Sequence, residues 1–380
     1  MKVSPLGAVE CAILHDDFTP LPASTLFAWA ERIGRDLGIR DDLSPMVTST
    51  DTDAHMMFGN IRVLISQSPT PLGPRGFERA LQLDWNKIQF PEADQVVARH
   101  RAYTFVTIGK GAIDLSQLGE MATFMVETAP EGCCFTDRAE VDLALAWCRR
   151  LALQIQNAHA ATALHWCMND ILMKPAHFEL VAKADASEML GILPIIFKEG
   201  PGQPVTVIGF GSDWLVGKLV AFVEESAPIE YLVEHIWAFS AMCSFRGALL
   251  PDGDNYSREG ENELIHIQYC AGDRHVPRDY IRLSVRKSEK YGIDLQSPPQ
   301  LKVQYNPDGG VKSFDESGLP PAMRDDPRIA AELARRRAEL SGPTTKLDLA
   351  RYRTMARAPL PTAQPQRSLF QSVMDRLLRR

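Results

Sequence analysis

The densest cluster of nucleophile-type side chains is His165-Trp166-Cys167, with His159 six residues earlier and Cys133-Cys134 further upstream. In a β-strand, residues 165 and 167 point to the same face, so the imidazole can contact the sulfur and generate a thiolate. No orienting carboxylate or oxyanion donor stands at a recognisable spacing from this pair. The alternative interpretation is a half-buried strand that packs one histidine and one cysteine against a core, and we expect this second arrangement.

A second group of candidate polar residues is the acidic segment Asp252-Gly253-Asp254. With Glu263 it places acids at positions 1, 3 and 12 of a calcium-type loop. Tyr256 and Ser257 occupy positions where such a loop needs a ligand and a turn glycine, so we expect a polar turn instead. If the chain is an enzyme, the candidate catalytic groups are His165, Cys167, Asp252 and Asp254, in a cleft between two subdomains.

Other patterns argue against cofactor chemistry. The sequence has no HExxH, CxxC or His-x-His motif, so we expect neither a metal nor another cofactor. The glycines of residues 208–217 lie between two strand patterns rather than between a strand and a helix, and Gly109-Lys110-Gly111 lacks the spacing of a phosphate-binding loop. Arg335-Arg336-Arg337 has no interleaved aromatic residues and reads as a solvated helix face rather than a nucleic-acid contact.

The elements that would position these residues begin with an N-terminal α+β subdomain over residues 1–130. Apolar stretches predict buried or alternating strands, and 3.6-residue spacing predicts a helix ending near Gly38. The order strand-helix-strand-strand-helix-strand is that of a ferredoxin-like unit. The strands are expected at 8–14, 46–50, 54–58, 61–66 and 102–108, and helices at 26–37, 77–83 and 91–99.

Residues 131–294 form a second expected α+β subdomain. Helices over 137–157 and 228–245 carry apolar side chains at helical spacing. The expected strands are 161–167, 192–197, 264–270 and 280–285, with a hairpin made by 205–210 and 214–222. Short connections imply mostly antiparallel pairing, so the predicted fold class is α+β with two mostly antiparallel, ferredoxin-like α/β sandwiches.

The remaining segment, 295–380, has the Pro, Gly, Asp and Ser content of a linker and tail. Helices are expected near 327–340 and 368–380. The second has a Ser368 N-cap and basic residues at its C-terminal end. Its apolar side chains form a candidate partner-binding face: Leu369, Phe370, Val373, Met374, Leu377 and Leu378.

Charge is divided unevenly along the chain. The net charge of −7 combines 27 Lys and Arg against 40 Asp and Glu in residues 1–310 with 14 against 8 in residues 311–380. The acidic body would be repelled by nucleic acid and by anionic lipid. Seven cysteines without a CxxC pair favour a reducing cytoplasm. The longest apolar run, 190–197, is shorter than the about 20 residues of a membrane-spanning helix, so we expect no transmembrane segment.

Several stretches resemble a bacterial family, domain of unknown function 4261. They are SPTPLGPRGFERAL (68–81), FPEADQVVARHRAYTFVTI (90–108), TALHWC (162–167), VTVIGFGSDW (205–214) and the region around LPDGDNYS (250–257), within residues 8–286. The resemblance implies a cytoplasmic α+β domain and supplies no substrate, cofactor or catalytic residue. The chain departs from the family at Asn255, where the family commonly has Thr, and in its basic tail after residue 295.

These patterns together favour a non-enzymatic cytoplasmic binding or adaptor protein. A short amphipathic helix on a Pro/Gln spacer is typical of helix-in-groove ligands. Residues 368–380 are therefore expected to dock on a protein partner or on the chain's own body. An enzyme using the cleft between the subdomains is the alternative, and the sequence leaves the oligomeric state open.

Overall fold

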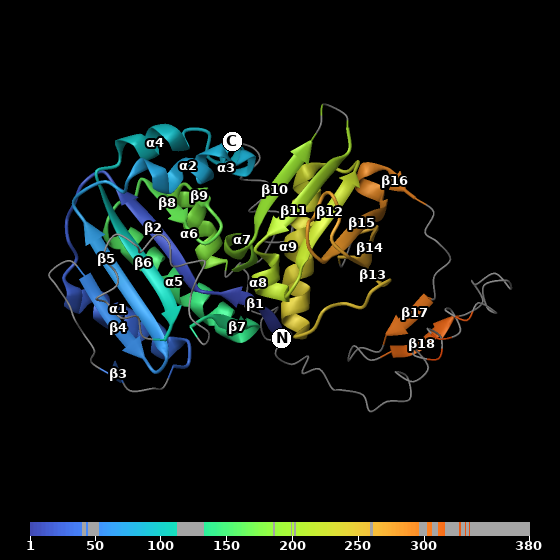
Figure 1. Ribbon diagram of the computed structural model, residues 1–380, viewed down its shortest axis with the longest axis horizontal. Coiled ribbons are helices and arrows are strands. Elements are labelled where there is room, and N and C mark those ends of the chain that lie inside the picture. The colour runs from blue at the N-terminus through green and yellow to red at the C-terminus, as the bar shows by residue number, and fades with distance from the viewer. Residues whose placement is uncertain are drawn as a thin grey trace, which may run out of the picture. The chain divides into compact units, whose positions relative to one another are not determined.

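The computed structural model describes residues 1–39, 43–44, 53–111, 133–184, 187–198, 200, 203–258, 261–295, 302–305, 311–315, 327, 331 and 334. The chain divides into two compact units, and residues 1–291 lie in the first. Two antiparallel-rich sheets with helices packed on them make up this first unit (Figure 1). The α+β prediction is confirmed.

The first sheet has the strand order β3-β4-β5-β6-β2-β8-β9, and each neighbouring pair is antiparallel. β4 and β5 alternate strictly between buried and half-buried residues, as expected for strands with one face on a core. The strands are β2 (Ala8–His15), β3 (Leu43–Ser44), β4 (Asp53–Phe58), β5 (Ile61–Ser68), β6 (Ala102–Lys110), β8 (Ala163–Trp166) and β9 (Ile171–Met173).

Helices pack on both faces of this sheet. The long helix α5 (Arg138–Ala158) contacts β2 and β6, and α1 (Ala23–Asp36) contacts α5 and β4. The opposite face of β2, with Ala12 and Leu14, packs against Phe77, Ala80 and other apolar side chains of a short-helix segment. That segment contains η1 (Pro74–Phe77), α2 (Glu78–Gln82), α3 (Asp84–Gln89) and α4 (Ala93–Arg99).

The ferredoxin-like expectation is corrected by the strand order. The expected strand 46–50 lies outside the described residues, and the other expected elements of residues 1–130 are present. A split β-α-β unit has one strand between the two that a helix connects. Here α1 leads from β2 to the edge strands β3 and β4, and both β5 and β6 lie between β4 and β2 in the sheet. β5 and β6, joined by the short helices, are direct neighbours over eight register pairs from Ile61↔Lys110 to Ser68↔Tyr103. The sheet also extends across the expected boundary at residue 130, because β8 pairs with β2.

The second sheet has the path β10-β11-β12-β15-β14-β13. Its one parallel pair is β12 with β15, and α9 (Ile229–Arg246) packs on β11 and β12. The strands on this path are β10 (Leu193–Lys198), β11 (Val205–Phe210), β12 (Leu219–Glu225), β13 (Asn255–Tyr256), β14 (Glu263–Cys270) and β15 (Tyr280–Ser288).

The expected hairpin strand over 214–222 is wrong in its first half. Residues Ser212–Val216 form the helix α8 instead, and the strand begins at Leu219. Gly211 and Gly217 flank α8 with φ values of 93° and 81°. A Cβ at Gly211 would lie 2.2 Å from the carbonyl oxygen of Gly191, so this turn into the helix requires glycine.

The other described elements of the first unit include a short strand pair and two short helices next to α5. β1 (Lys2–Leu6) pairs with β7 (Phe135–Asp137), and α6 (Pro175–Lys183) and α7 (Ser187–Gly191) pack on α5. η3 (Glu289–Tyr291) follows β15. In the second unit, β16 (Ile293–Asp294) precedes an antiparallel pair, β17 (Lys302–Tyr305) with β18 (Val311–Asp315). Within the expected helix 327–340, Pro327, Ala331 and Ala334 are described and are helical, and the expected helix 368–380 lies outside the described residues.

Candidate functional site

The acidic segment Asp252-Gly253-Asp254 is a turn against β14. The Asp252 carboxylate accepts a hydrogen bond from the backbone N of Tyr269 at 2.7 Å, and the carbonyl oxygen of Asp254 accepts one from Ile267 N at 2.8 Å. Gly253 has a φ of 81°, which suits a tight turn. Glu263, the third acid of the calcium-type pattern, binds Arg258 instead. The described contacts of Asp252 are those of turn chemistry, on a different sheet from His165 and Cys167.

The structure brings His165 and Cys167 together near the end of β8. The Sγ atom of Cys167 lies 3.7 Å from Nδ1 of His165 and 3.4 Å from the His165 carbonyl oxygen. His165 is buried, with its ring 5.3 Å from that of Phe77, whereas Cys167 is half-buried. The expected packing of this pair against a core is present, and so is the contact that a Cys/His dyad requires.

A carboxylate that the sequence did not single out completes this group. Oδ1 of Asp170 lies 3.3 Å from Nε2 of His165, and its Oδ2 forms an ion pair with Arg79 at 3.1 Å. Asp170 has a φ of 60°, unusual for a residue other than glycine, and its carbonyl oxygen accepts a hydrogen bond from the buried side chain of Asn86 at 2.7 Å. The tight turn between β8 and β9 therefore folds Asp170 back onto His165.

This geometry fixes the roles of the two imidazole nitrogens. The Asp170 carboxylate accepts hydrogen bonds, so Nε2 of His165 is the donor of that pair, and Nδ1 is the ring nitrogen that faces the Cys167 sulfur. Burial raises the pKa of the Cys167 thiol well above its usual range, and the nearby Glu10 and Cys11 add to this rise. The sulfur is therefore a protonated thiol at neutral pH, and His165 is the base within reach of its proton.

Glu10 is the second carboxyl group on this face of the sheet. The backbone N of Cys167 donates to the Glu10 carbonyl oxygen at 2.9 Å, which extends the β2–β8 pairing by one residue. On the other side, Glu10 is paired in register with Thr107, whose hydroxyl lies 3.5 Å from its carboxylate. Burial raises the pKa of Glu10 from its ordinary value, against the opposing effects of Thr107 and Arg62. We name Cys167, His165, Asp170 and Glu10 the thiol cluster.

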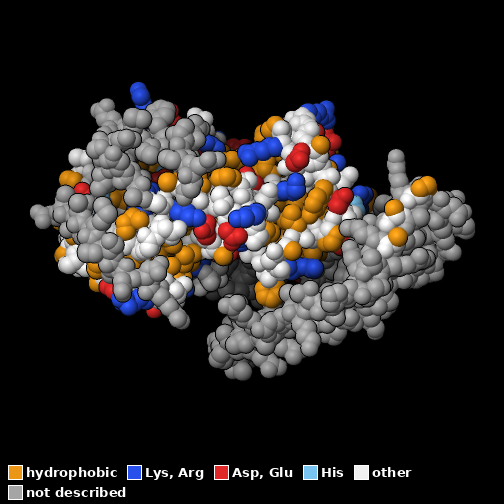
Figure 2. Space-filling view, turned by 60° about the horizontal axis from the view of Figure 1, so that its bottom comes forward, with side chains coloured by type: hydrophobic (Ala, Val, Ile, Leu, Met, Phe, Trp, Pro, Cys, Tyr) orange, Lys and Arg blue, Asp and Glu red, His pale blue; other side chains and the backbone are white. Residues whose placement is uncertain are grey.

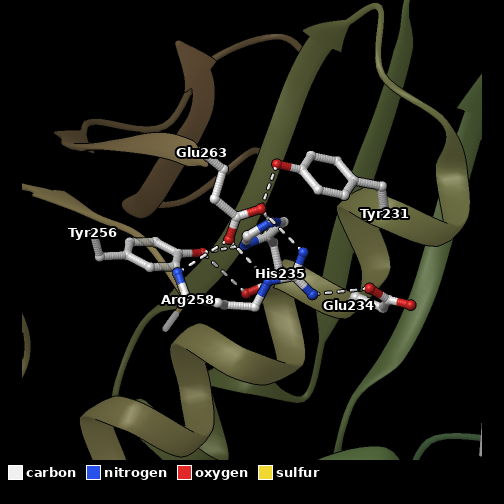
Figure 3. A network of polar contacts seen from close by, with 6 residues as sticks. All are labelled: Tyr231, Glu234, His235, Tyr256, Arg258 and Glu263. Carbon is white, nitrogen blue, oxygen red and sulfur yellow. Dashed lines mark hydrogen bonds and ion pairs between the residues drawn. The ribbon is translucent and has the colours of Figure 1, made fainter. Parts of the chain in front are cut away.

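A second polar cluster lies between α9 and β14 (Figure 3). Glu263 is its centre: its carboxylate accepts from Nε2 of His235 at 3.1 Å, from the Tyr231 hydroxyl at 2.9 Å and from Nε of Arg258 at 2.8 Å. The Arg258 guanidinium also bonds Glu234 at 3.0 Å. We name these residues, with Tyr256, the Glu263 network.

Burial and charge oppose one another in the Glu263 network. Burial alone would raise the pKa of Glu263, but hydrogen bonds from His235 and Arg258 outweigh it and hold that pKa far below its usual range. The pKa of His235 is lowered because burial disfavours the imidazolium, although Glu263 opposes this. The Tyr256 hydroxyl lies 3.1 Å from His235 Nδ1, so both ring nitrogens have a partner. The network is a satisfied, largely buried group that fastens β13 and Arg258 to α9.

The sequence pattern on α9 held a signal for this network. Glu234 and His235 interrupt the apolar stretch of α9 between Tyr231 and Phe239, and both are buried. Buried ionisable groups need partners, so a base and a counter-acid were to be expected nearby. Which residues supply them depends on the pairing of β13 with β14, and no local pattern encodes that pairing.

A small cavity is lined by α3, β9, α6, α7 and α9. Its walls include Trp85, Met173, His177, Met189 and Trp237, and its volume of about 10 Å³ is near that of one water. Nε2 of His177 is buried without a hydrogen-bond partner in the described structure. Burial lowers the pKa of His177 to about 4, so its ring is neutral at pH 7.

Membrane-spanning helices, metal sites and apolar surface patches are considered for the described residues alone. No described helix has the length and apolar character needed to cross a membrane, and the described part of the chain contains no group of three His, Cys, Asp or Glu able to hold a metal ion. On the face shown in Figure 2, charged and hydrophobic side chains are interspersed. The large exposed apolar side chains of the first unit are Ile88, Phe197 and Phe245. The expected partner-binding face, residues 369–378, lies outside the described residues.

Comparison of the chain with family models, curated proteins and solved structures finds no match. The resemblance to domain of unknown function 4261 therefore stays a prediction.

Proposed function

We propose that the protein is a cytoplasmic binding or adaptor protein, non-enzymatic in this role, that uses residues 368–380 as a helical ligand. The observation that carries the proposal is the sequence spacing of Leu369, Phe370, Val373, Met374, Leu377 and Leu378, which predicts one apolar helix face after the Pro/Gln-containing spacer sequence 358–366. Such a face buries itself in an apolar groove of a protein partner. Its Arg376, Arg379 and Arg380 would meet acidic side chains at the rim of that groove.

The alternative is an enzyme that uses His165, Cys167, Asp252 and Asp254, and the described contacts of these residues favour the binding proposal instead. Asp252 binds the backbone of Tyr269, and His165 is buried beneath Phe77. These two groups serve different sheets and hold turns or core packing. A joint catalytic centre of His165, Cys167, Asp252 and Asp254 draws no support from such contacts.

Co-purification with full-length protein and with a 1–357 truncation tests the proposal. Both are tagged at the N-terminus, and bound proteins are compared at 0.15 M and 0.5 M salt, because basic rim contacts weaken with ionic strength. We expect a defined partner to be retained by the full-length protein and lost from the truncation, with an unchanged Tm. Equal partner recovery by both forms, together with a lower Tm for the truncation, would show that the segment packs on its own body instead.

A further inference from the structure

The thiol cluster contains every group needed for a single addition to sulfur. In the described part of the chain, Cys167 is the cysteine whose Sγ lies within hydrogen-bond distance of an imidazole. The remaining nitrogen of that imidazole is held by Asp170, which Arg79 and Asn86 fix in turn. Arg79, Asp170, His165 and the Cys167 sulfur therefore form a continuous series of side-chain contacts.

We propose that Cys167 is a nucleophilic modification site for neutral, soft carbon electrophiles of the α,β-unsaturated carbonyl class, with His165 as the base. Asp170 is a positioning residue, because it touches His165 and not the sulfur. This proposal goes beyond the binding function, since one covalent adduct forms per chain without turnover.

The addition balances without an oxidant or a second reactant. A sulfur lone pair forms the bond to the β-carbon of the electrophile while the carbon-carbon π electrons move toward the carbonyl to give an enolate. The thiol proton passes to Nδ1 of His165 and from there to the α-carbon. The product is a thioether, and the imidazole returns to its neutral form.

The electrophile class follows from the charges around the sulfur. Asp170 lies 3.3 Å from the far nitrogen of the His165 ring, and Glu10 is bonded through its carbonyl oxygen to the backbone N of Cys167 at 2.9 Å, so two acidic residues flank Cys167. Negative charge on either residue disfavours the thiolate. An anionic reagent would meet the same repulsion. A neutral reagent avoids it, and a protonated thiol then depends on His165 for removal of its proton.

The test measures the rate of modification of each cysteine in the native full-length protein. N-ethylmaleimide is added below one equivalent at pH 7, and the adducts on every cysteine are counted by peptide mass spectrometry. Cys270 is the internal reference, because it is also half-buried and its sulfur contacts the carbonyl oxygen of Gln268 and the hydroxyl of Tyr280 rather than an imidazole. We expect Cys167 to react about 10-fold faster than Cys270. This ratio is smaller than the rate increase of about 100-fold or more that a positioned general base typically gives.

Three variants separate base catalysis from simple exposure. H165Q is expected to slow Cys167 about 10-fold, and D170N to slow it less while shifting the midpoint of its pH–rate profile. H275Q, in a histidine of the second sheet's loop, should leave the absolute rate of Cys167 unchanged. Iodoacetate should modify Cys167 more slowly than iodoacetamide when both are scaled to Cys270.

Two results would overturn the proposal. One is a wild-type Cys167 that reacts no faster than Cys270, which requires no variant to fold. The other is an unchanged Cys167 rate in D170N and H165Q proteins that keep the native Tm. Neither result bears on partner binding by residues 368–380, which the truncation measures separately.

Discussion

The carboxylate of Glu263 on β14 lies 3.1 Å from Nε2 of His235 on α9, and side-chain exposure is 3% for Glu263 and 0% for His235. Because this carboxylate also binds Arg258 and Tyr231, its removal leaves several buried donors without an acceptor. We expect E263Q to lower the free energy of unfolding by about 3 kcal/mol, the range for breaking a buried ion pair. Urea denaturation followed by circular dichroism measures the change.

A matched control for E263Q is E224Q. Glu224 pairs with Arg274 at the surface, and their side chains are 54% and 78% exposed. Exposed pairs contribute little, so E224Q should change the unfolding free energy by less than about 1 kcal/mol. Equal effects of the two substitutions would contradict the structural role given to the Glu263 network.

His177 predicts a specific dependence of stability on pH. Its folded pKa is about 4 against an ordinary value of 6.5, so the unfolded chain binds a proton that the folded chain does not between these values. Stability therefore falls as the pH drops from 6.5 to 4, by at most about 3 kcal/mol from this group. H177F should flatten this part of the pH profile relative to wild type. An H177F profile parallel to wild type would show that the ring is not held neutral.

Gly34 on α1 is a position where packing excludes a side chain. A Cβ there would lie 2.7 Å from Cζ2 of Trp147, a buried side chain of α5. G34A is expected to lower the free energy of unfolding by about 2 kcal/mol through overpacking. G73A is the control, because a Cβ at Gly73 meets no atom within 4 Å and its φ is −58°. Thermal melts that rank G73A at or above wild type and G34A below it would agree with this packing.

Local patterns predicted the elements well where one face of an element meets a core. The predictions for α5, α9 and β6 lie within two residues of the observed bounds, since apolar periodicity there reflects direct burial. The order of the strands was not predictable in this way. Whether β5 pairs with β6 or with β2 depends on contacts between residues 35 or more positions apart, and the ferredoxin-like arrangement fits the same local pattern.

The thiol cluster was likewise predictable only in part from the sequence. Same-face placement of His165 and Cys167 follows from strand alternation alone. The contact of Asp170 with His165 was not predictable, because Asp170 reaches the ring through a turn in which its φ is 60°. The residue type alone does not indicate that conformation. Glu10 is more than 150 residues away in sequence, and the β2–β8 pairing alone brings it beside Cys167.

Co-purification of the partner with point variants tests most sharply whether the expected apolar face of residues 368–380 binds a protein partner. F370D with L377D places charge on the apolar face, and Q371D with S372D places the same charge on the polar face. We expect the partner recovered with wild type to be lost from F370D/L377D, retained by Q371D/S372D, and bound by a synthetic 368–380 peptide. Equal retention of that partner by both double variants would contradict the claim.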